Sequence, residues 1–327
     1  MRGQRQRPPA RDRAAPRGDR TGPHNAGVPT DRPLDEFEAQ RTRLFGLAYR
    51  LLGSAHDAED VVQDAYLRWH GADGVRTPSA WLTRVVTNLC LNRLTSARAR
   101  RERYVGPWLP EPVPTADGAL GPLETAEQRE SVSFAFLVLL ERLTPAERAV
   151  FVLHRAFGYG HREIAELTGL SEANCRQLHH RARQHVARAA PRFPGDRAAG
   201  ARLVERFLAA ARGGDVAGLA ELLAADVTSW ADGGGRVSVA RRPVVGRDRV
   251  IRYLVGGITR FGAGLDAAVV EVNGLPAVLG TAGGAVVGVL APDLADGRIT
   301  ALRIVANPAK LEFLRRGLSH PGGLVGS

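Results

Sequence analysis

The chain has 327 residues and a mass of 35.1 kDa, a length that predicts two or three domains. Hydrophobic residues make up 44% and charged residues 24%, which excludes collagen-like and wholly disordered chains. The net charge is +11, and every cation among Lys and Arg except Lys310 is an arginine, whose forked guanidinium suits phosphates and base edges. Two cysteines, Cys90 and Cys175, cannot form a disulfide framework, which predicts a cytoplasmic protein.

The N-terminal residues have the composition of a basic disordered tail. Residues 1–33 contain eight arginines and almost no large apolar side chains, so they cannot bury enough surface to fold alone. Met1 is the only methionine, and translation from a non-ATG codon such as that of Val28 stays open as an alternative. No apolar run of a signal peptide occurs there. The uncharged segment Val272–Pro292 holds five glycines and two prolines, which favours strands joined by turns over a membrane span.

Apolar residues at helical spacing predict three helices in residues 34–105. The first helix ends at Gly53, and the second, His56–Trp69, combines apolar positions with four acidic residues. The third, Ser79–Arg103, follows Pro78, whose fixed backbone suits a first helical turn. An all-α domain is therefore expected in this part of the chain.

Composition divides the rest of the chain into a linker, a second helical block and an α+β domain. Residues 106–130 contain five prolines and form an acidic linker, and residues 131–197 are predicted to be helical again. Residues 198–320 become rich in glycine and β-branched residues after two short helices, and residues 321–327 form a tail. The predicted strands are Val269–Val272, Ala285–Leu290 and Ile299–Val305, with an Asp296-Gly297 hairpin turn between the last two.

Residues His161–Arg183 have the pattern of a helix-turn-helix. The helix His161–Thr168 is followed by a turn at Gly169 and by Ser171, a favourable N-cap. Apolar residues of the next helix share one face, which leaves an opposite face of arginine, histidine and amide side chains suited to the DNA major groove. The alternative is a solvated basic helix packed on a bundle. The predicted DNA-reading residues are Arg176, Gln177, His180, Arg181 and Arg183.

No metal site and no cofactor are predicted. Cys175 and His179 are one helical turn apart, and His180 and His185 are near in sequence, which is the only grouping that suggests zinc. Cys175, however, belongs to the helix face that must pack, and no second cysteine is near. We therefore expect Cys175 to be a core residue.

The two other helices with unusual charge have separate expected roles. The acidic helix is expected to dock on a positively charged protein surface through Asp57, Glu59, Asp60, Gln63 and Asp64, the alternative being a solvated face. The basic third helix carries a tryptophan that can stack on an unpaired base, or else fills the core, followed by a polar stripe and an arginine cluster suited to phosphates. Its candidate residues are Trp81, Arg84, Asn88, Asn92, Arg98, Arg100 and Arg101.

Several segments resemble those of a bacterial family of transcription factors. Asp57–Asp64 and Trp81–Leu89 resemble region 2 of extracytoplasmic-function (ECF) sigma factors, and Leu143–Arg148 with the following helix-turn-helix resembles their region 4. Three further motifs are similar to those of a SigJ-type subgroup with a fused SnoaL-like (NTF2-like) C-terminal domain. These motifs are Trp108-Leu109-Pro110-Glu111-Pro112, Asp232-Gly233-Gly234-Gly235-Arg236 and Asn307-Pro308-Ala309-Lys310-Leu311, in which Arg236 and Ala309 stand where relatives often have Lys and Asp.

The resemblance implies a protein that directs core RNA polymerase to promoters. The acidic helix would dock on the β′ clamp and region 4 near the β flap, the helix-turn-helix would read the −35 element, and the third helix with loop His70–Pro78 would capture the melted −10 strand. The expected fold is two all-α sigma domains followed by an α+β cone. The cone is expected to regulate activity in cis, with the Gly233–Gly235 loop meeting the linker at Trp108–Pro112. Alternatives are a small-ligand sensor, an enzyme, or a polymerase-independent regulator; no anti-sigma partner is identified.

Overall fold

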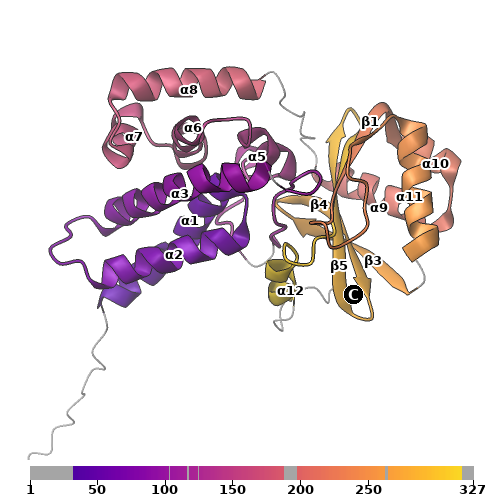
Figure 1. The fold of residues 1–327 in the computed structure, drawn as a ribbon, viewed down its shortest axis with the longest axis horizontal. Coiled ribbons are helices and arrows are strands. Elements are labelled where there is room, and N and C mark those ends of the chain that lie inside the picture. The colour runs from indigo at the N-terminus through magenta and orange to yellow at the C-terminus, as the bar shows by residue number, and fades with distance from the viewer. Residues whose placement is uncertain are drawn as a thin grey trace, which may run out of the picture.

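A computed structural model places a helical half beside a half built on a β-sheet (Figure 1). The tails predicted at residues 1–33 and 321–327 fall almost wholly outside the described part of the chain. No helix in that part is long and apolar enough to cross a membrane. The described residues are 32–102, 104–115, 118–123, 125–187, 197–261 and 264–318.

The first three helices confirm the predicted all-α block. They are α1 (Arg32–Leu52), α2 (Ala55–His70) and α3 (Pro78–Glu102). Gly53 has a φ of +67°, a left-handed conformation that glycine adopts without a steric penalty, and it ends α1 as expected. The Ser54 side chain accepts a hydrogen bond from the Asp57 amide and so starts α2.

The second helical block begins with two short helices and ends in the helix-turn-helix. The Thr144 side chain and Glu147 form a capping box at the start of the longest helix before the turn, because each accepts a hydrogen bond from the backbone N–H of the other. Gly158, at a φ of +72°, closes that helix. The elements are α4 (Ala126–Glu130), α5 (Phe134–Leu140), α6 (Pro145–Phe157), α7 (His161–Thr168) and α8 (Glu172–Ala187).

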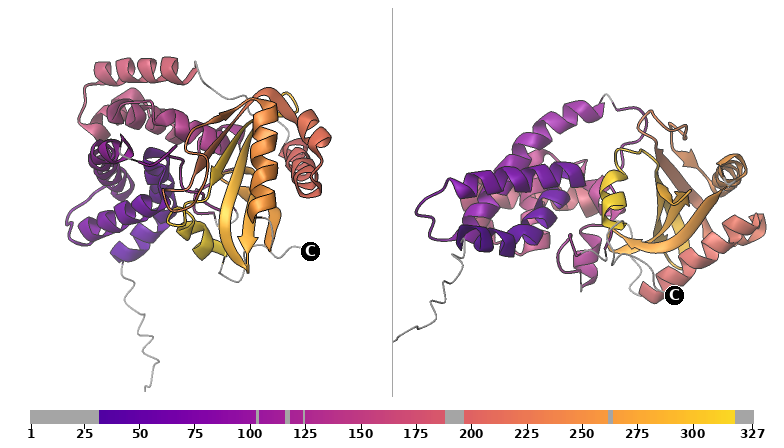
Figure 2. Two further views of the ribbon diagram at one scale, coloured as in Figure 1. Left: turned by 45° about the vertical axis from the view of Figure 1, so that its right-hand side comes forward. Right: turned by 90° about the horizontal axis from the view of Figure 1, so that it is seen from below.

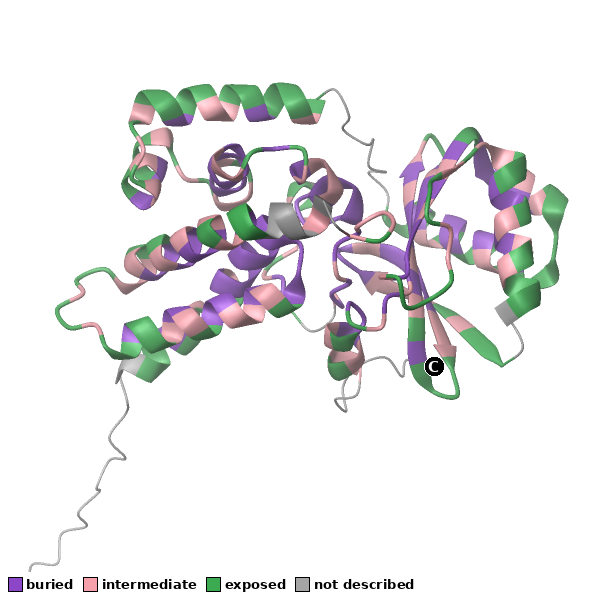
Figure 3. Ribbon diagram, in the orientation of Figure 1, coloured by how far each residue is buried: buried purple, intermediate pink, exposed green. Residues whose placement is uncertain are grey.

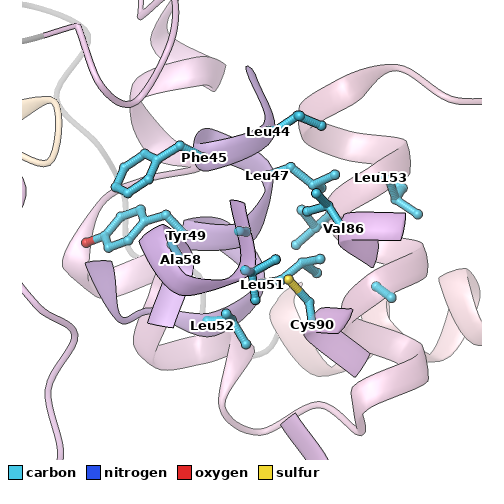
Figure 4. Close-up of a cluster of buried hydrophobic side chains, with 14 of the residues drawn as sticks. Leu44, Phe45, Leu47, Tyr49, Leu51, Leu52, Ala58, Val86, Cys90 and Leu153 are labelled. Carbon is cyan, nitrogen blue, oxygen red and sulfur yellow. The ribbon is translucent and has the colours of Figure 1, made fainter. Parts of the chain in front are cut away.

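One continuous hydrophobic core joins the two helical blocks. Helix α1 lies at its centre and packs against α2, α3 and α6. Figure 4 shows Leu47 and Leu51 beside Val86 and Cys90 of α3, with Leu153 of α6 on the same side. The two blocks are therefore packed together and form a closed arrangement rather than two separate bodies.

The C-terminal half is an α+β domain around a six-stranded mixed sheet with strand order β2-β1-β6-β5-β4-β3. Strands β1 and β6 run parallel, and the other neighbours are antiparallel. The strands are β1 (Leu223–Asp232), β2 (Val244–Val245), β3 (Leu265–Val272), β4 (Leu275–Ala282), β5 (Ala285–Ala295) and β6 (Arg298–Val305). The helices are α9 (Arg197–Gly213), α10 (Val216–Leu222), α11 (Arg247–Phe261) and α12 (Glu312–Leu318).

The strand predictions were right in position but incomplete. The Asp296-Gly297 turn is confirmed, because both residues have positive φ between the paired residues Ala295 and Arg298, as a two-residue hairpin of type I′ requires. Residues 272–292 form strands and turns, as expected. The prediction omitted strand β1 and helix α11, although Val250, Ile251 and Leu254 of α11 recur at helical spacing on one buried face.

Both faces of the sheet are covered by other elements of the chain. Helices α9, α10 and α11 pack with Leu302 and Val278 on one face. The other face packs Val289 against Leu109 of the linker, Phe134 of α5 and Leu314 of α12. Figure 2 shows α12 lying between the sheet and the helical half. The second hydrophobic face therefore joins the α+β domain to the rest of the chain.

Candidate nucleic-acid and polymerase interfaces

The predicted helix-turn-helix is present in the structure. Gly169 has a φ of +75° and donates its N–H to Ala165, which ends α7, and the Ser171 side chain accepts a hydrogen bond from the Asn174 amide at the start of α8. Ile164 of α7 and Cys175 of α8 are fully buried between the helices. The packed face of α8 therefore fixes which of its side chains point outward.

All five predicted DNA-reading residues lie on the exposed face of α8. Figure 3 shows this helix as mostly exposed along its length. The guanidinium of Arg176 pairs with Glu172 one turn earlier, and His180 contacts Gln184 at 2.9 Å. These partners are themselves exposed and compete with DNA only weakly, so the face is open to a major groove. The remaining members of the set are Gln177, Arg181 and Arg183.

Cys175 is a core residue, as expected, and burial raises the pKa of its thiol. The grouping of Cys175 with His180 and His185 does not form, because those two histidines are exposed on other faces of α8. His179, in contrast, lies against histidines of α6 and α7 that the sequence spacing did not bring to attention.

The acidic residues of α2 are held by an arginine from the neighbouring helix. Arg93 of α3 places its Nη atoms 3.5 Å from Asp57, 3.2 Å from Asp60 and 3.1 Å from Asp64. All three carboxylates keep part of their surface exposed, and Gln63 is exposed beside them. Three carboxylates against one guanidinium leave this face negatively charged.

Glu59, the fifth member of the acidic set, is paired with the C-terminal domain. Both Nη atoms of Arg316 in α12 contact its carboxylate oxygens, at 3.2 and 2.5 Å. Beside this pair Phe313 stacks on Phe45 of α1, with ring centroids 5.4 Å apart. Helix α12 thus covers one end of the surface predicted to dock on the polymerase.

The polar stripe of α3 is partly exposed, whereas its tryptophan packs inward. Arg84 and Asn92 are exposed and Asn88 is half-buried between them. Trp81 is half-buried, and its ring lies 5.7 Å from that of Trp69. This tertiary packing supports the core interpretation of Trp81 in the closed structure.

Arg101 departs from the expectation of a phosphate-binding side chain. Its guanidinium pairs with Glu141 just beyond α5, donates 2.8 Å to the Leu52 carbonyl and lies 3.8 Å from the Trp108 ring centroid. Arg101 therefore lies at the junction between the two helical blocks, where Glu141 supplies its counter-charge. The side chains of Arg98 and Arg100 lie outside the described residues.

The linker meets the α+β domain at one buried carboxylate. Asp232, at the end of β1, accepts hydrogen bonds from the Leu109 amide at 2.9 Å and the Tyr104 hydroxyl at 2.6 Å. Lys310 Nζ lies 2.7 Å from the same carboxylate and donates to the Leu109 carbonyl. Asp232 has no exposed surface and Lys310 has 6%. Burial lowers the pKa of Lys310 to about 8, opposed by the charge of Asp232.

The three subgroup motifs form this junction together. Arg101 and Lys310 both make cation–π contacts with the Trp108 ring, and Asn307 donates 2.8 Å to the hydroxyl of Tyr104. The predicted contact at Trp108–Pro112 is made by Asp232, which lies just before the 233–235 loop and accepts a hydrogen bond from the Leu109 amide. The loop itself lies farther along, where a Cβ on Gly235 would contact Val105 at the end of the first helical block. Besides Asp232 and Lys310, the buried members of the motifs are Leu109, Pro110, Pro112, Gly233, Asn307 and Leu311; Gly234 and Pro308 are half-buried, and Gly235 and Arg236 are exposed.

Glu111, in the same linker motif, ties the linker to the acidic helix. Its carboxylate accepts hydrogen bonds from the Ser54 hydroxyl at 2.8 Å and the His56 amide at 3.0 Å, at the N-terminus of α2. Burial raises the pKa of Glu111, opposed by these two hydrogen bonds. Two nearby linker residues therefore make different contacts: Leu109 contacts the α+β domain, and Glu111 contacts helix α2.

The comparisons with known proteins agree with this architecture. Residues 37–100 match the Sigma-70 region 2 family and residues 133–186 match Sigma-70 region 4. The chain is 42% identical over 292 residues to the ECF RNA polymerase sigma factor SigJ of Mycobacterium tuberculosis, covering 85% of this chain and 92% of that protein. The chain belongs to the ECF sigma factors. It is also 34% identical to the probable ECF sigma factor SigI of that organism, covering 86% and 96%.

The crystal structure of M. tuberculosis SigJ matches this ECF sigma factor over 86% of its length. The TM-score is 0.68, the sequence identity 36%, and 98% of the SigJ chain is covered. The match extends across the sigma domains and the α+β domain. The multidomain fold class predicted from the sequence, two helical sigma domains followed by an α+β cone, is therefore confirmed.

One residue at the domain junction of this sigma factor escaped the sequence interpretation. Asn273, at a φ of +54° in the β3–β4 turn, is fully buried and donates 2.6 Å to the Tyr49 hydroxyl and 2.7 Å to the Val132 carbonyl. Its side-chain oxygen accepts from the Val113 amide at 3.0 Å. The Asn-Gly pair at 273–274 was the available signal, but it predicts a hairpin and says nothing about what the turn contacts.

Proposed function

We propose that this sigma factor reads the −35 element through the exposed face of α8. The support is the set of arginine and glutamine side chains that the packing of Cys175 and Ile164 turns toward solvent. Arg176 or Arg181 would contact guanine edges, and Gln177 would contact adenine. Arg183 and His180 would contact the phosphate backbone of the DNA. This exposed face is the observation that carries the proposal for duplex recognition.

For the −10 element the proposed surface is α3 with the loop at 71–77. Arg84, Asn88 and Asn92 recur every four residues and lie on one side of α3. A melted strand needs a cationic track and a stacking partner. Trp81 can supply the stacking only if the Trp69 contact is exchanged for a base when the strand binds.

The polymerase contacts follow from the charge of α2. We place the β′ clamp on the face formed by Asp57, Asp60, Gln63 and Asp64, which stays exposed beside Arg93. Region 4 would lie near the β flap. The chain would then work in the cytoplasm, where its polymerase is.

The closed arrangement must open before both promoter elements are bound. Elements centred at −35 and −10 are about 25 base pairs apart, or about 85 Å along B-DNA. In the structure α3 packs directly against α6 and α7, whereas α8 itself is only about 24 Å long. The linker between the sigma domains must therefore be released or rerouted in the transcribing complex.

The α+β domain is proposed to regulate this opening in cis rather than by catalysis. It holds the linker at Leu109 through Asp232 and Lys310, and it covers Glu59 of α2 through Arg316. The buried carboxylate of Asp232, the kind of group that a catalytic site would use, instead makes hydrogen bonds that join the domains. These contacts support a role that depends on where the domain sits.

A small ligand of this domain is the second candidate role. A cavity of about 230 Å³ lies between the linker residues Val105 and Gly106 and the loop that carries Arg236 and Arg241. A molecule bound there would touch both sides of the junction and could shift the opening equilibrium. Its walls offer cationic side chains and backbone groups, which suits a small anion.

Runoff transcription with core polymerase tests the cis role in the full-length chain. Asp232→Asn leaves Lys310 buried without its carboxylate and is expected to change transcript yield severalfold at equal protein concentration. Asp226→Asn is the matched control, because Asp226 lies on the same strand with its side chain exposed. Equal yields from wild type and both variants would remove the regulatory role, while the absence of transcript from the wild type would remove the promoter role.

A further inference from the structure

Three histidines from three different helices meet inside the region 4 fold. His154 belongs to the last turn of α6, His161 begins α7, and His179 lies near the middle of α8. Their nitrogen ligand atoms all lie within 4.8 Å of one another. His161 Nε2 and His179 Nδ1 are 3.1 Å apart, and the rings of His154 and His179 are 4.0 Å apart between centroids.

The chemistry of this cluster favours neutral imidazoles. Burial, and then the neighbouring His154, His161, Arg183 and His180, together lower the pKa of His179 to about 4. The pKa of His154 is lowered by burial, then by His161 and Arg183. An imidazole without its second proton has a lone pair available, and this neutral form is the one that ligates metals.

We propose that His154, His161 and His179 form a binding site for a divalent transition-metal ion of the zinc class, with water in the fourth position. Three imidazoles with one open position are a recognised donor set for Zn²⁺. At Zn–N bonds of about 2.0–2.1 Å, tetrahedral ligand atoms lie about 3.3 Å apart. The His161–His179 pair already has nearly this spacing, so rotation of the His154 ring completes the set.

The donor set also determines which ions are excluded. Among the described residues, no carboxylate or cysteine sulfur belongs to the cluster, so hard cations such as Mg²⁺ and Ca²⁺ find no suitable ligands. Arg183 lies near enough to affect both His154 and His179, and its charge opposes a dication. The site is therefore expected to bind more weakly than a thiolate site.

An ion at this place would join the helices that carry and support the recognition surface. It would link α8 to α6 and to the N-terminus of α7, whose relation is now set by hydrophobic packing and by the contacts among the three histidines. The sequence spacing of 7 and 18 residues matches no zinc motif, because the ligands converge only when the helix-turn-helix folds onto α6. The inference is independent of the proposed contacts with DNA and polymerase.

The test is a zinc titration of the full-length protein after chelation, in competition with a chromophoric chelator. The wild-type chain is expected to take one zinc ion from the chelator. Its zinc affinity should fall at least tenfold in His161→Ala and in His154→Ala. His185→Ala is the matched control, because that histidine is exposed on α8 outside the cluster, and it should bind like the wild type. Zinc, but not Mg²⁺, should raise the melting temperature of the wild type and of this control only.

Replacement of zinc by Co²⁺ gives a second readout that surface binding does not reproduce. A four-coordinate site should show intense visible d–d absorption in the wild type and in His185→Ala, and lose it in both cluster variants. His161 is half-buried at a helix start, so circular dichroism of His161→Ala should match the wild type. Equal zinc affinity in all chains, or no competition by the wild type, would overturn the proposal.

Discussion

Two arginine–glutamate pairs in the helical half show how differently the same chemistry is used. On α8, Arg176 and Glu172 are exposed neighbours on one helix, with side chains 60% and 41% exposed. At the junction of the sigma domains, Glu141 pairs with Arg101 and with Arg148, whose side chain is only 2% exposed. The first pair can be exchanged for DNA at little cost, whereas the second fixes how two domains pack.

The difference teaches that a cluster of arginines is not by itself a nucleic-acid surface. Helix α8 packs through Cys175 and Ala182, so its arginines must point outward. The end of α3 lies where the linker turns back, so Arg101 meets Glu141, Leu52 and Trp108. Burial and the position of Glu141 therefore explain why Arg101 is paired within the protein whereas the arginines of α8 face solvent.

The largest expected effect is the loss of the carboxylate that pairs with the buried Arg148. Glu141→Gln removes the counter-charge of Arg148, whose burial already lowers its pKa to about 9, and the free energy of unfolding should fall by about 3 kcal/mol. Glu172→Gln, the exposed counterpart, should cost at most about 0.5 kcal/mol. Urea denaturation measures both, and similar losses would show that the two pairs do not differ as described.

The next effect separates the two surfaces by DNA binding. Arg181→Ala should weaken binding to a −35 duplex by about 1–3 kcal/mol, because it removes the base or phosphate contact proposed for this exposed side chain. Arg101→Ala should leave the affinity for that duplex unchanged, since its side chain is committed to Glu141. Fluorescence anisotropy at one fixed salt concentration measures both; an equal loss in the two variants would place Arg101 on the DNA after all.

A smaller effect depends on pH and belongs to the packed side of α8. His179 has a pKa of about 4 in the folded chain, below the 6.5 of the unfolded chain, because of burial and the facing His154, His161, His180 and Arg183. The unfolded chain thus binds more protons between these values, and this stabilisation is lost as the pH falls from 6.5 toward 4. The melting temperature should drop from pH 7 to pH 5 less steeply in metal-free His179→Asn than in metal-free wild type.

The smallest expected effect concerns the exposed contact between α12 and α2. The Arg316–Glu59 pair has side chains 50% and 38% exposed, so its coupling should be about 0.2–1 kcal/mol and should weaken with added salt. A double-mutant cycle of Arg316→Ala and Glu59→Gln measures this coupling in the free energy of unfolding. A coupling of several kcal/mol that is insensitive to salt would make it resemble the buried junction instead.

Local signals in the sequence sufficed for the elements that depend on short-range physics. The turn at Gly169, the N-cap at Ser171 and the Asp296-Gly297 turn each determine backbone conformation within a few residues, and the structure confirms all three. The apolar spacing in α8 correctly identified which face packs. Strand β1 was missed because its parallel partner β6 is distant in the chain. Helix α11 was missed although its apolar spacing is a local signal of an amphipathic helix.

The sequence by itself determined the order of the domains, the helix-turn-helix and the outward face of α8, because each follows from periodicity and capping along one segment. Only the tertiary structure decided that Asp232 is buried against Lys310, that Arg101 pairs with Glu141 and that three histidines converge. Those contacts join residues far apart in sequence. Their strength comes from burial and exact placement, and neither quantity is encoded in any one stretch of the chain.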